Sequence, residues 1–287
     1  MLNRHYTDLE QVSRQEVETV LQRGHLSREQ RRHYLCHVIE ARAYHIFKQD
    51  PTALCEALTR TDLDHYIQLL AQEQDLTICG CLCPEAAAAP LRQGPFPDLS
   101  HAIADWPVEQ MTMTIEAELK QARLRGGAST REPIYSGDWW SINLFDSSLE
   151  QPCPAAGFFP ESLKLLLQTE AMQRSLKLLQ QGGSHKPALI ARLSCIGPQS
   201  RIEPHFGVNL WKTRIHLPIQ IPDRDCFITG YNNQQQWRPH HALILDDTYL
   251  HAVVNASEEQ RIVLLVDIMH PAIDNQLWSE LQSWQAP

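Results

Sequence analysis

The spacing of apolar residues divides the chain into a helical first part and a strand-rich second part. Leu35, Val38 and Ile39 recur at helical spacing, as do other apolar residues before position 75. After Pro187 the apolar runs become short and rich in Ile, Val and Leu, with turn-forming residues between them. This change from helical to strand-like apolar spacing predicts helices that precede a β-structure and pack against it.

Residues 1–84 are predicted to form a small helical module. Ser27 and Gln30 fit a capping box. Asp50 followed by Pro51 fits a cap with proline at the first helical position. The pattern leaves open whether this module serves packing, dimerisation or substrate recognition.

Residues 85–287 are predicted to form a second domain. An Ala/Pro-rich connector extends to about Pro107, and helices are expected at Val108–Arg125 and Pro160–Gln181, each stopping at a Gly-Gly pair. The expected strands are Ala188–Ile196, Thr213–Ile221, Cys226–Thr229, His241–Leu245 and Arg261–Met269. Short strands at this spacing favour a jelly-roll sandwich or barrel, so the predicted fold class is α+β. Ile262–Val266 is apolar without alternation, which predicts a strand covered on both faces.

Composition narrows the classes of function. With 43% apolar residues the chain can bury a real core, and a formal net charge of −9 argues against nucleic acid or an anionic membrane as the main partner. The N-terminus lacks the apolar stretch of a signal peptide and no run reaches bilayer-spanning length, so we expect a soluble, cytoplasmic protein. The eight cysteines are interpreted as free thiols. For Cys79, Cys81 and Cys83 we favour structural thiols over a metal or redox site, because their spacing is not that of a zinc knuckle.

Two of the fourteen histidines stand in neighbourhoods that suggest chemistry. His205 follows Pro204 at a turn after a strand, and His251 comes shortly after the expected strand that ends at Leu245. Arg261 opens the next strand. Two imidazoles at strand ends in a barrel mouth can bind a first-row metal. An arginine close to them offers a fork suited to one end of a dicarboxylate.

The stretch from Leu193 to Pro271 resembles the aspartyl/asparaginyl β-hydroxylase family of iron(II)/2-oxoglutarate oxygenases. The matching blocks are Ser194, Gly197-Pro198, Pro204-His205-Phe206-Gly207, Arg214-Ile215-His216-Leu217, Leu245-Asp246-Asp247-Thr248-Tyr249-Leu250-His251, Arg261 and Val266-Asp267-Ile268-Met269-His270-Pro271. A looser echo lies at Gly137-Asp138-Trp139. The resemblance implies a double-stranded β-helix (cupin-like) core at about 135–271, with a helical N-terminal region.

The resemblance also implies a ligand set. His205 and His251 would hold Fe(II), while Arg261 and Ser194 would hold the distal carboxylate of 2-oxoglutarate. His216 would line the same pocket.

Further residues are implied at the substrate side. Arg214 would line the co-substrate pocket near the substrate carboxylate, and Trp139 would lie at the substrate entrance. Lys212 stands where the family tends to place an arginine near the substrate's acid group, so the charge is kept and the bidentate fork is lost.

Structural alternatives exist for several of these residues. Ser194 could satisfy backbone groups within its strand, and His216 could be a packed core histidine. Arg214 could form an ion pair with Asp246 or Asp247.

The position two residues after His205, where most such enzymes place a carboxylate ligand, is Gly207. The family resembles this chain in having glycine there. Asp246 and Asp247 could compensate from outside the coordination sphere by hydrogen-bonding metal-bound water. A small residue at this position could also admit chloride, which would turn hydroxylation into halogenation.

The expected function is therefore hydroxylation with Fe(II), 2-oxoglutarate and O2. The expected substrate is an aspartyl- or asparaginyl-type residue of an acidic peptide, a protein or an amino-acid-derived molecule, hydroxylated at its β-carbon. The alternatives are a hydroxylase of a lipid or sugar headgroup and a non-catalytic metal-binding module. The sequence leaves the substrate and the oligomeric state open.

Overall fold

The computed structural model describes residue 91 and residues 93–124, 130–131, 137–182, 187–205, 211–230, 233–249 and 251–283. The predicted helical module at 1–84 and the cysteine cluster at 79–83 lie outside these residues. The three cysteines that are described, Cys153, Cys195 and Cys226, are buried and form no disulfide.

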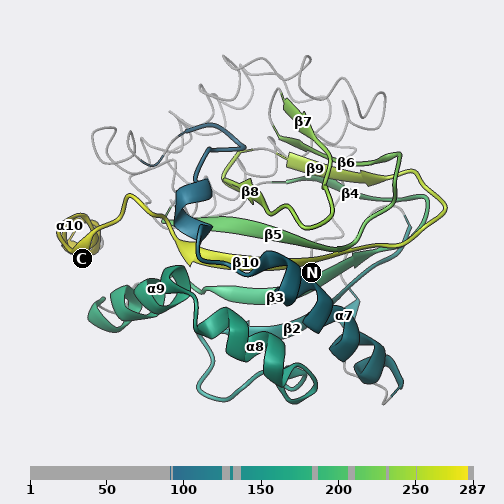
Figure 1. Cartoon of the computed structure of the whole chain (residues 1–287). Helices are drawn as coiled ribbons and strands as arrows, with labels where there is room; N and C mark the ends of the chain where they lie inside the picture. Colours follow the sequence, from purple (N-terminus) through teal and green to yellow (C-terminus); the bar gives the residue numbers. More distant parts are fainter. Residues whose placement is uncertain are drawn as a thin grey trace, which may run out of the picture.

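The strands form two antiparallel sheets (Figure 1). The six-stranded sheet has the order β1 (Thr130–Arg131), β2 (Trp139–Asp146), β3 (Ile190–Ile196), β10 (Arg261–Met269), β5 (Lys212–Gln220) and β8 (Leu243–Leu245). The four-stranded sheet has the order β4 (Ser200–His205), β9 (His251–Asn255), β6 (Cys226–Gly230) and β7 (Asn233–Gln235). β3 and β10 are neighbours in the six-stranded sheet although they lie far apart in sequence, because the chain between them passes back and forth between the two sheets. This is a double-stranded β-helix, and the predicted fold class is confirmed.

The helices among the described residues are α7 (Val108–Leu124), α8 (Pro160–Leu167), α9 (Glu170–Gln181) and α10 (Asn275–Ser283), with short 3-10 turns η3 (Ser100–Ile103) and η4 (Ala156–Phe158). The single helix expected over Pro160–Gln181 is wrong, because Thr169 is extended (φ −65°, ψ 145°) and separates α8 from α9. Its hydroxyl accepts a hydrogen bond from the Met172 amide at 3.3 Å and caps the second helix. Within the described parts of the chain, no helix combines the length and apolar character needed to cross a bilayer.

The strands predicted from apolar runs are present, and β10 has the predicted bounds and is covered on both faces. The described strands extend from Thr130 to Met269, and the β-helix core was predicted at about 135–271. The apolar pattern did not predict β2, β4 or β9 as strands. One placement needs correction: His205 is the last residue of β4 rather than part of a turn. His251 follows the strand that ends at Leu245, as expected, and itself opens β9.

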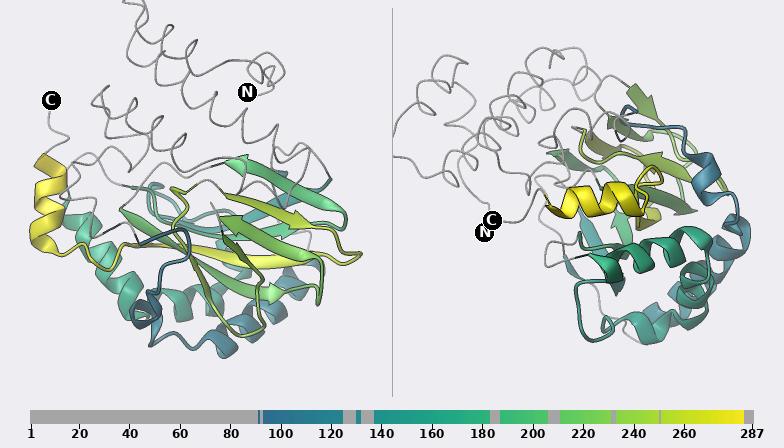
Figure 2. Two further views of the ribbon diagram at one scale, coloured as in Figure 1. Left: turned by 90° about the horizontal axis from the view of Figure 1, so that it is seen from above. Right: turned by 90° about the vertical axis from the view of Figure 1, so that its left-hand side faces the viewer.

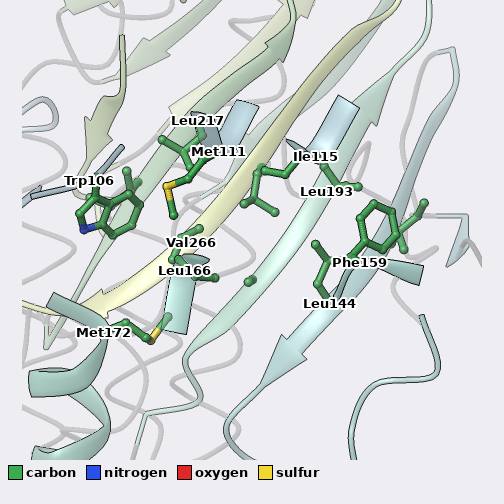
Figure 3. Packing of buried hydrophobic residues seen from close by; sticks show 14 of the residues in the cluster. Trp106, Met111, Ile115, Leu144, Phe159, Leu166, Met172, Leu193, Leu217 and Val266 are labelled. Atoms are coloured by element: carbon green, nitrogen blue, oxygen red, sulfur yellow. The ribbon is translucent and has the colours of Figure 1, made fainter. Parts of the chain in front are cut away.

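The outer face of the six-stranded sheet is apolar and packs against α7, α8 and α9, which lie together on that side of the sheet (Figures 1 and 2). Figure 3 shows Leu193, Leu217 and Val266 from the strands meeting Met111 and Leu166 from the helices. Each such side chain stabilises the fold by about 1.5–3 kcal/mol when fully buried. This layer makes the six-stranded sheet a rigid base for the opposite face.

The inner face of the same sheet carries the polar residues. Successive side chains of a strand point to opposite faces, so Ser194, His216 and Arg261 lie opposite their apolar neighbours. The strand register places Val263 of β10 beside Ser194 of β3, and Arg261 two residue pairs further along, opposite Ile196. The alternation therefore collects the predicted co-substrate residues on one surface that faces the four-stranded sheet.

His270, just after β10, is a buried histidine whose titration should influence stability. Burial, and then the positive charge of Arg174, lowers its pKa to about 4. The unfolded chain then binds a proton between pH 6.5 and 4 that the folded chain does not. Stability should therefore fall by roughly 3 kcal/mol as the pH drops through this window.

Urea unfolding of the His270→Asn variant, in which the amide oxygen can replace the ring nitrogen that accepts from the Ala272 amide, should show a flatter profile between pH 6.5 and 4. The exposed His101→Asn variant serves as the control. An unchanged slope in His270→Asn would contradict the assignment.

Candidate active site

The register of the four-stranded sheet brings the two predicted metal ligands together. His205 of β4 is paired directly with His251 of β9. Directly opposed residues of antiparallel strands have Cβ atoms about 4.5–5.5 Å apart. The side chain of His205 lies outside the described residues, as does Gly207. The backbone therefore places two histidines that are 46 positions apart in sequence at neighbouring points of one sheet.

The His251 ring is buried and its tautomer follows from its partner. Its Nδ1 lies 2.8 Å from the carbonyl oxygen of Tyr249. A carbonyl can only accept, so Nδ1 carries the proton and the neutral ring has its lone pair on Nε2. This is the usual way in which a protein orients a metal-binding imidazole.

Arg261 is 1% exposed, and among the described residues no carboxylate pairs with it. Its Nη1 donates to the carbonyl oxygen and the Oγ of Ser194, each at 3.2 Å, and its Nε has no hydrogen-bond partner within the described structure. Burial lowers the pKa of Arg261 to about 10, which still leaves it charged at neutral pH. A buried guanidinium held only by neutral groups is costly unless an anion joins it.

The Ser194 hydroxyl links this arginine to a tryptophan. Its Oγ accepts from Arg261 and also from the Trp139 indole nitrogen, at 3.1 Å. A hydroxyl has two acceptor positions, so its own proton is left to be donated. Ser194 therefore does more than satisfy its own strand. Trp139, predicted at the substrate entrance, is half-buried and holds the Ser194 hydroxyl through this hydrogen bond.

His216 lies on the same face, and Trp237, which the sequence analysis missed, is its partner. The Trp237 indole nitrogen donates to His216 Nδ1 at 3.2 Å, so the proton of the neutral ring is on Nε2. Burial, followed by the charges of Arg261 and Arg214, lowers the pKa of His216 well below its usual value. His216 Nε2 is buried and has no partner among the described residues. A signal for Trp237 was available, because it is an isolated aromatic residue after the polar run Asn232–Gln236.

Lys212 and Arg214 are paired with buried carboxylates. Asp267 contacts Lys212 Nζ at 2.7 Å and Arg214 Nε at 2.7 Å, and Asp247 contacts Arg214 Nη1 at 2.9 Å. Burial raises the pKa of Asp267, but the two cations outweigh it and the pKa is lowered. The structural alternative for Arg214 is therefore the observed arrangement, with Asp247 and, in addition, Asp267, a partner that the sequence analysis did not consider. Lys212 and Arg214 are therefore not unpaired cations that could bind a substrate carboxylate without giving up an existing ion pair.

Asp246 and Asp247 both make contacts within the described residues of the site. Asp246 Oδ1 accepts from the amide and hydroxyl of Thr248, at 3.0 and 2.6 Å, and so holds the turn that leads to His251. Asp247 uses Oδ2 for Arg214, while its buried Oδ1 has no hydrogen-bond partner in the described structure. Both carboxylates therefore shape the site, and a direct role toward metal-bound water stays a prediction.

Arg192 is a further cation on this face that the sequence analysis missed. It lies two positions before Ser194 on β3, and its Nε donates to the neutral Asn143 side-chain oxygen at 2.6 Å. The register pairs Arg192 with Leu265, on the side of Ser194 away from Arg261. The charge in the middle of an Ile-Ala-Arg-Leu-Ser strand was the available signal.

These residues can be compared with those of known proteins. A family model described as aspartyl/asparaginyl β-hydroxylase matches residues 109–271, more than half of the chain. The chain belongs to the aspartyl/asparaginyl β-hydroxylase family. The match includes α7 and every paired strand, so the helical layer behind the site is part of the family's domain as well as the strands.

Curated relatives of this family share limited lengths with the chain. The aspartyl/asparaginyl β-hydroxylase of Mus musculus is 31% identical over 85 residues, which are 30% of this chain and 12% of that protein. Aspartate β-hydroxylase domain-containing protein 2 of Xenopus tropicalis is 31% identical over 155 residues, 53% of this chain and 39% of that protein. The matches thus span well under half of these relatives.

Among solved structures, a Pseudomonas putida prolyl-4-hydroxylase covers 65% of this chain and is itself fully covered, with 12% identity and a TM-score of 0.38. A Burkholderia pseudomallei oxidoreductase of the 2OG-Fe(II) oxygenase family covers 54% of this chain and 78% of its own, with 10% identity and a TM-score of 0.37. These similarities are too distant to inform the site, which rests on the strand order and contacts described above.

Proposed function

We propose that the protein is a hydroxylase that depends on iron(II) and 2-oxoglutarate. The observation that carries this proposal is the buried, charged Arg261, which has only neutral partners among the described residues and lies on the surface facing the His205–His251 pair. A dicarboxylate co-substrate would supply the missing negative charge. The Ser194 hydroxyl and His216 Nε2–H add two neutral donors beside it.

The residues present fit the absent metal and co-substrate. His251, held through Nδ1, would bind iron(II) through Nε2, with His205 as the second ligand. Arg261 and Ser194 would hold the distal carboxylate of 2-oxoglutarate. When bound, iron(II) and 2-oxoglutarate activate dioxygen for insertion of one oxygen atom into a C–H bond, with release of succinate and carbon dioxide. The chain's residues orient the co-substrate and neutralise its charge.

The substrate is proposed to be an acidic, Asp-type side chain of a peptide, hydroxylated at its β-carbon. Arg192 brings a positive charge to the inner face next to Ser194, while Lys212 and Arg214 are already paired with carboxylates. The names of the family and of its curated relatives agree with this substrate class.

The direct experiment measures succinate formed from 2-oxoglutarate by the iron-loaded full chain, alone and with panels of Asp- and Asn-containing peptides. Peptide-dependent succinate, together with a mass gain of one oxygen on the peptide, would support the proposal. Lipid and sugar headgroups form a parallel panel, and turnover with them instead would change the substrate class. If no panel yields succinate, the proposal of an enzyme is contradicted and the alternative of a non-catalytic metal-binding module is favoured.

Replacing Arg261 with methionine should raise the KM for 2-oxoglutarate roughly a hundredfold, because charge-assisted hydrogen bonds to one carboxylate are lost. Iron(II) affinity should change little, since the side chain does not reach the ligands through any described contact. Stability should be kept or increased, because an apolar side chain of similar length replaces a buried charge. Initial-rate kinetics and thermal unfolding measure these effects.

The exposed Arg224→Met variant is the matched control and should keep the normal KM. Equal loss of iron and of 2-oxoglutarate binding in Arg261→Met would indicate a collapsed site rather than a lost anchor.

A further inference from the structure

Trp237 contacts two of the residues that are proposed to donate to the co-substrate, His216 and Arg261. It lies in the connection between β7 and β8, and it is 4% exposed. The Cζ of Arg261 lies 4.4 Å from the centre of its ring. The His216 ring is nearly parallel to it, at 11°, and accepts its N–H. One side chain thus contacts both His216 and Arg261.

The indole N–H determines the tautomer of His216. Because Nδ1 accepts from Trp237, the neutral ring must carry its proton on Nε2. That Nε2–H is buried and has no partner among the described residues. Without the indole donor, the opposite tautomer would become accessible and would present a lone pair, which repels a carboxylate.

The face of the indole determines the plane of Arg261. The ring covers one face of the guanidinium, and Ser194 holds Nη1. These two contacts leave the edge that carries Nε, which has no partner in the described structure. A guanidinium edge is a planar fork, so its orientation decides whether a carboxylate can bind it through two parallel hydrogen bonds.

We propose that Trp237 is a positioning residue for 2-oxoglutarate. Its N–H keeps His216 in the Nε2–H form, and its ring keeps the Arg261 edge turned toward the same anion. This inference rests on the proposed function for the identity of the anion. Trp237 touches neither His205 nor His251 through any described contact, so its effect is expected on co-substrate binding and not on the metal.

The two contributions can be separated by substitution. Trp237→Phe keeps an aromatic face for Arg261 and removes the N–H, whereas Trp237→Leu removes both. The matched control is Trp278→Phe, because Trp278 is 2% exposed and its indole nitrogen donates to the Leu178 carbonyl at 2.8 Å in a different cluster. Each phenylalanine variant therefore loses one buried indole hydrogen bond.

The first measurement is the tautomer of His216, from long-range ¹H–¹⁵N spectra of the metal-free full chain labelled with ¹⁵N-histidine. The native protein and Trp278→Phe should show protonated Nε2 and unprotonated Nδ1. Trp237→Phe should show a mixture of the two tautomers. A native ring protonated on Nδ1, or an unchanged tautomer in Trp237→Phe, would overturn the proposal.

The second measurement is the dissociation constant of 2-oxoglutarate from the iron-loaded protein under nitrogen. Trp237→Phe should raise it roughly tenfold, and Trp237→Leu roughly another tenfold, with iron affinity unchanged. Equal increases in Trp237→Phe and Trp278→Phe would show general loosening and overturn the proposal. If the native protein binds no 2-oxoglutarate but the tautomer responds to Trp237→Phe, the proposed function fails while the control of His216 stands.

Discussion

Alanine in place of His251 is expected to weaken iron(II) binding by at least roughly a hundredfold and to abolish succinate formation. His251 is buried, its tautomer is set by the Tyr249 carbonyl, and the only histidine opposite it in the strand register is His205. A site with two protein ligands has no third side chain to keep the metal when one is removed. Metal titration followed by turnover measurements at pH 7.5 would show both effects.

The matched control is His270→Ala, because His270 is equally buried but lies outside the site. Both variants should lose stability, since each leaves a cavity, and only His251→Ala should lose iron. Iron binding that survives in His251→Ala, or that is lost equally in His270→Ala, would contradict the assignment of the metal ligand.

Replacing Asp267 with asparagine should lower the free energy of unfolding by roughly 3–5 kcal/mol. Asp267 is 0% exposed and neutralises Lys212 and Arg214, so the substitution leaves a buried excess of positive charge. The double variant Asp267→Asn with Lys212→Met should recover part of the loss, because it removes the cation that has no other described carboxylate. Urea unfolding at pH 7 measures both changes.

The pH dependence supplies a second test of the same residue. The folded-state pKa of Asp267 is lowered, so its stabilisation is fully present above about pH 4 and is lost as the pH falls through the folded-state pKa. The native protein should therefore lose this contribution only in strong acid, below the window in which His270 acts. An effect of Asp267→Asn no larger than that of the exposed Asp223→Asn would contradict the buried ion-pair network.

The ion pairs also change the interpretation of the substrate side. The family resemblance predicted that Lys212 and Arg214 lie near an acidic group of the substrate. In the structure both cations form ion pairs with Asp267 of β10, and Arg214 also pairs with Asp247 of the β8–β9 turn. Neither cation is therefore left without a carboxylate partner in the described structure. A residue's charge is visible in sequence, while its neutralisation depends on which strands become neighbours.

Local apolar runs predicted the jelly-roll class and the bounds of β10, because each run is a stretch of consecutive residues. The ordered motif blocks predicted that Ser194, His216 and Arg261 belong to one pocket, and their roles there stay a prediction. The apolar pattern did not predict β2, β4 or β9, in which polar residues interrupt the apolar runs, nor the break at Thr169, which depends on one capping hydroxyl. The tertiary structure alone decided that His205 opposes His251, that Asp267 binds two cations and that Trp237 contacts both His216 and Arg261. These contacts join positions that lie far apart in sequence, and only strand pairing and burial bring them within hydrogen-bond distance.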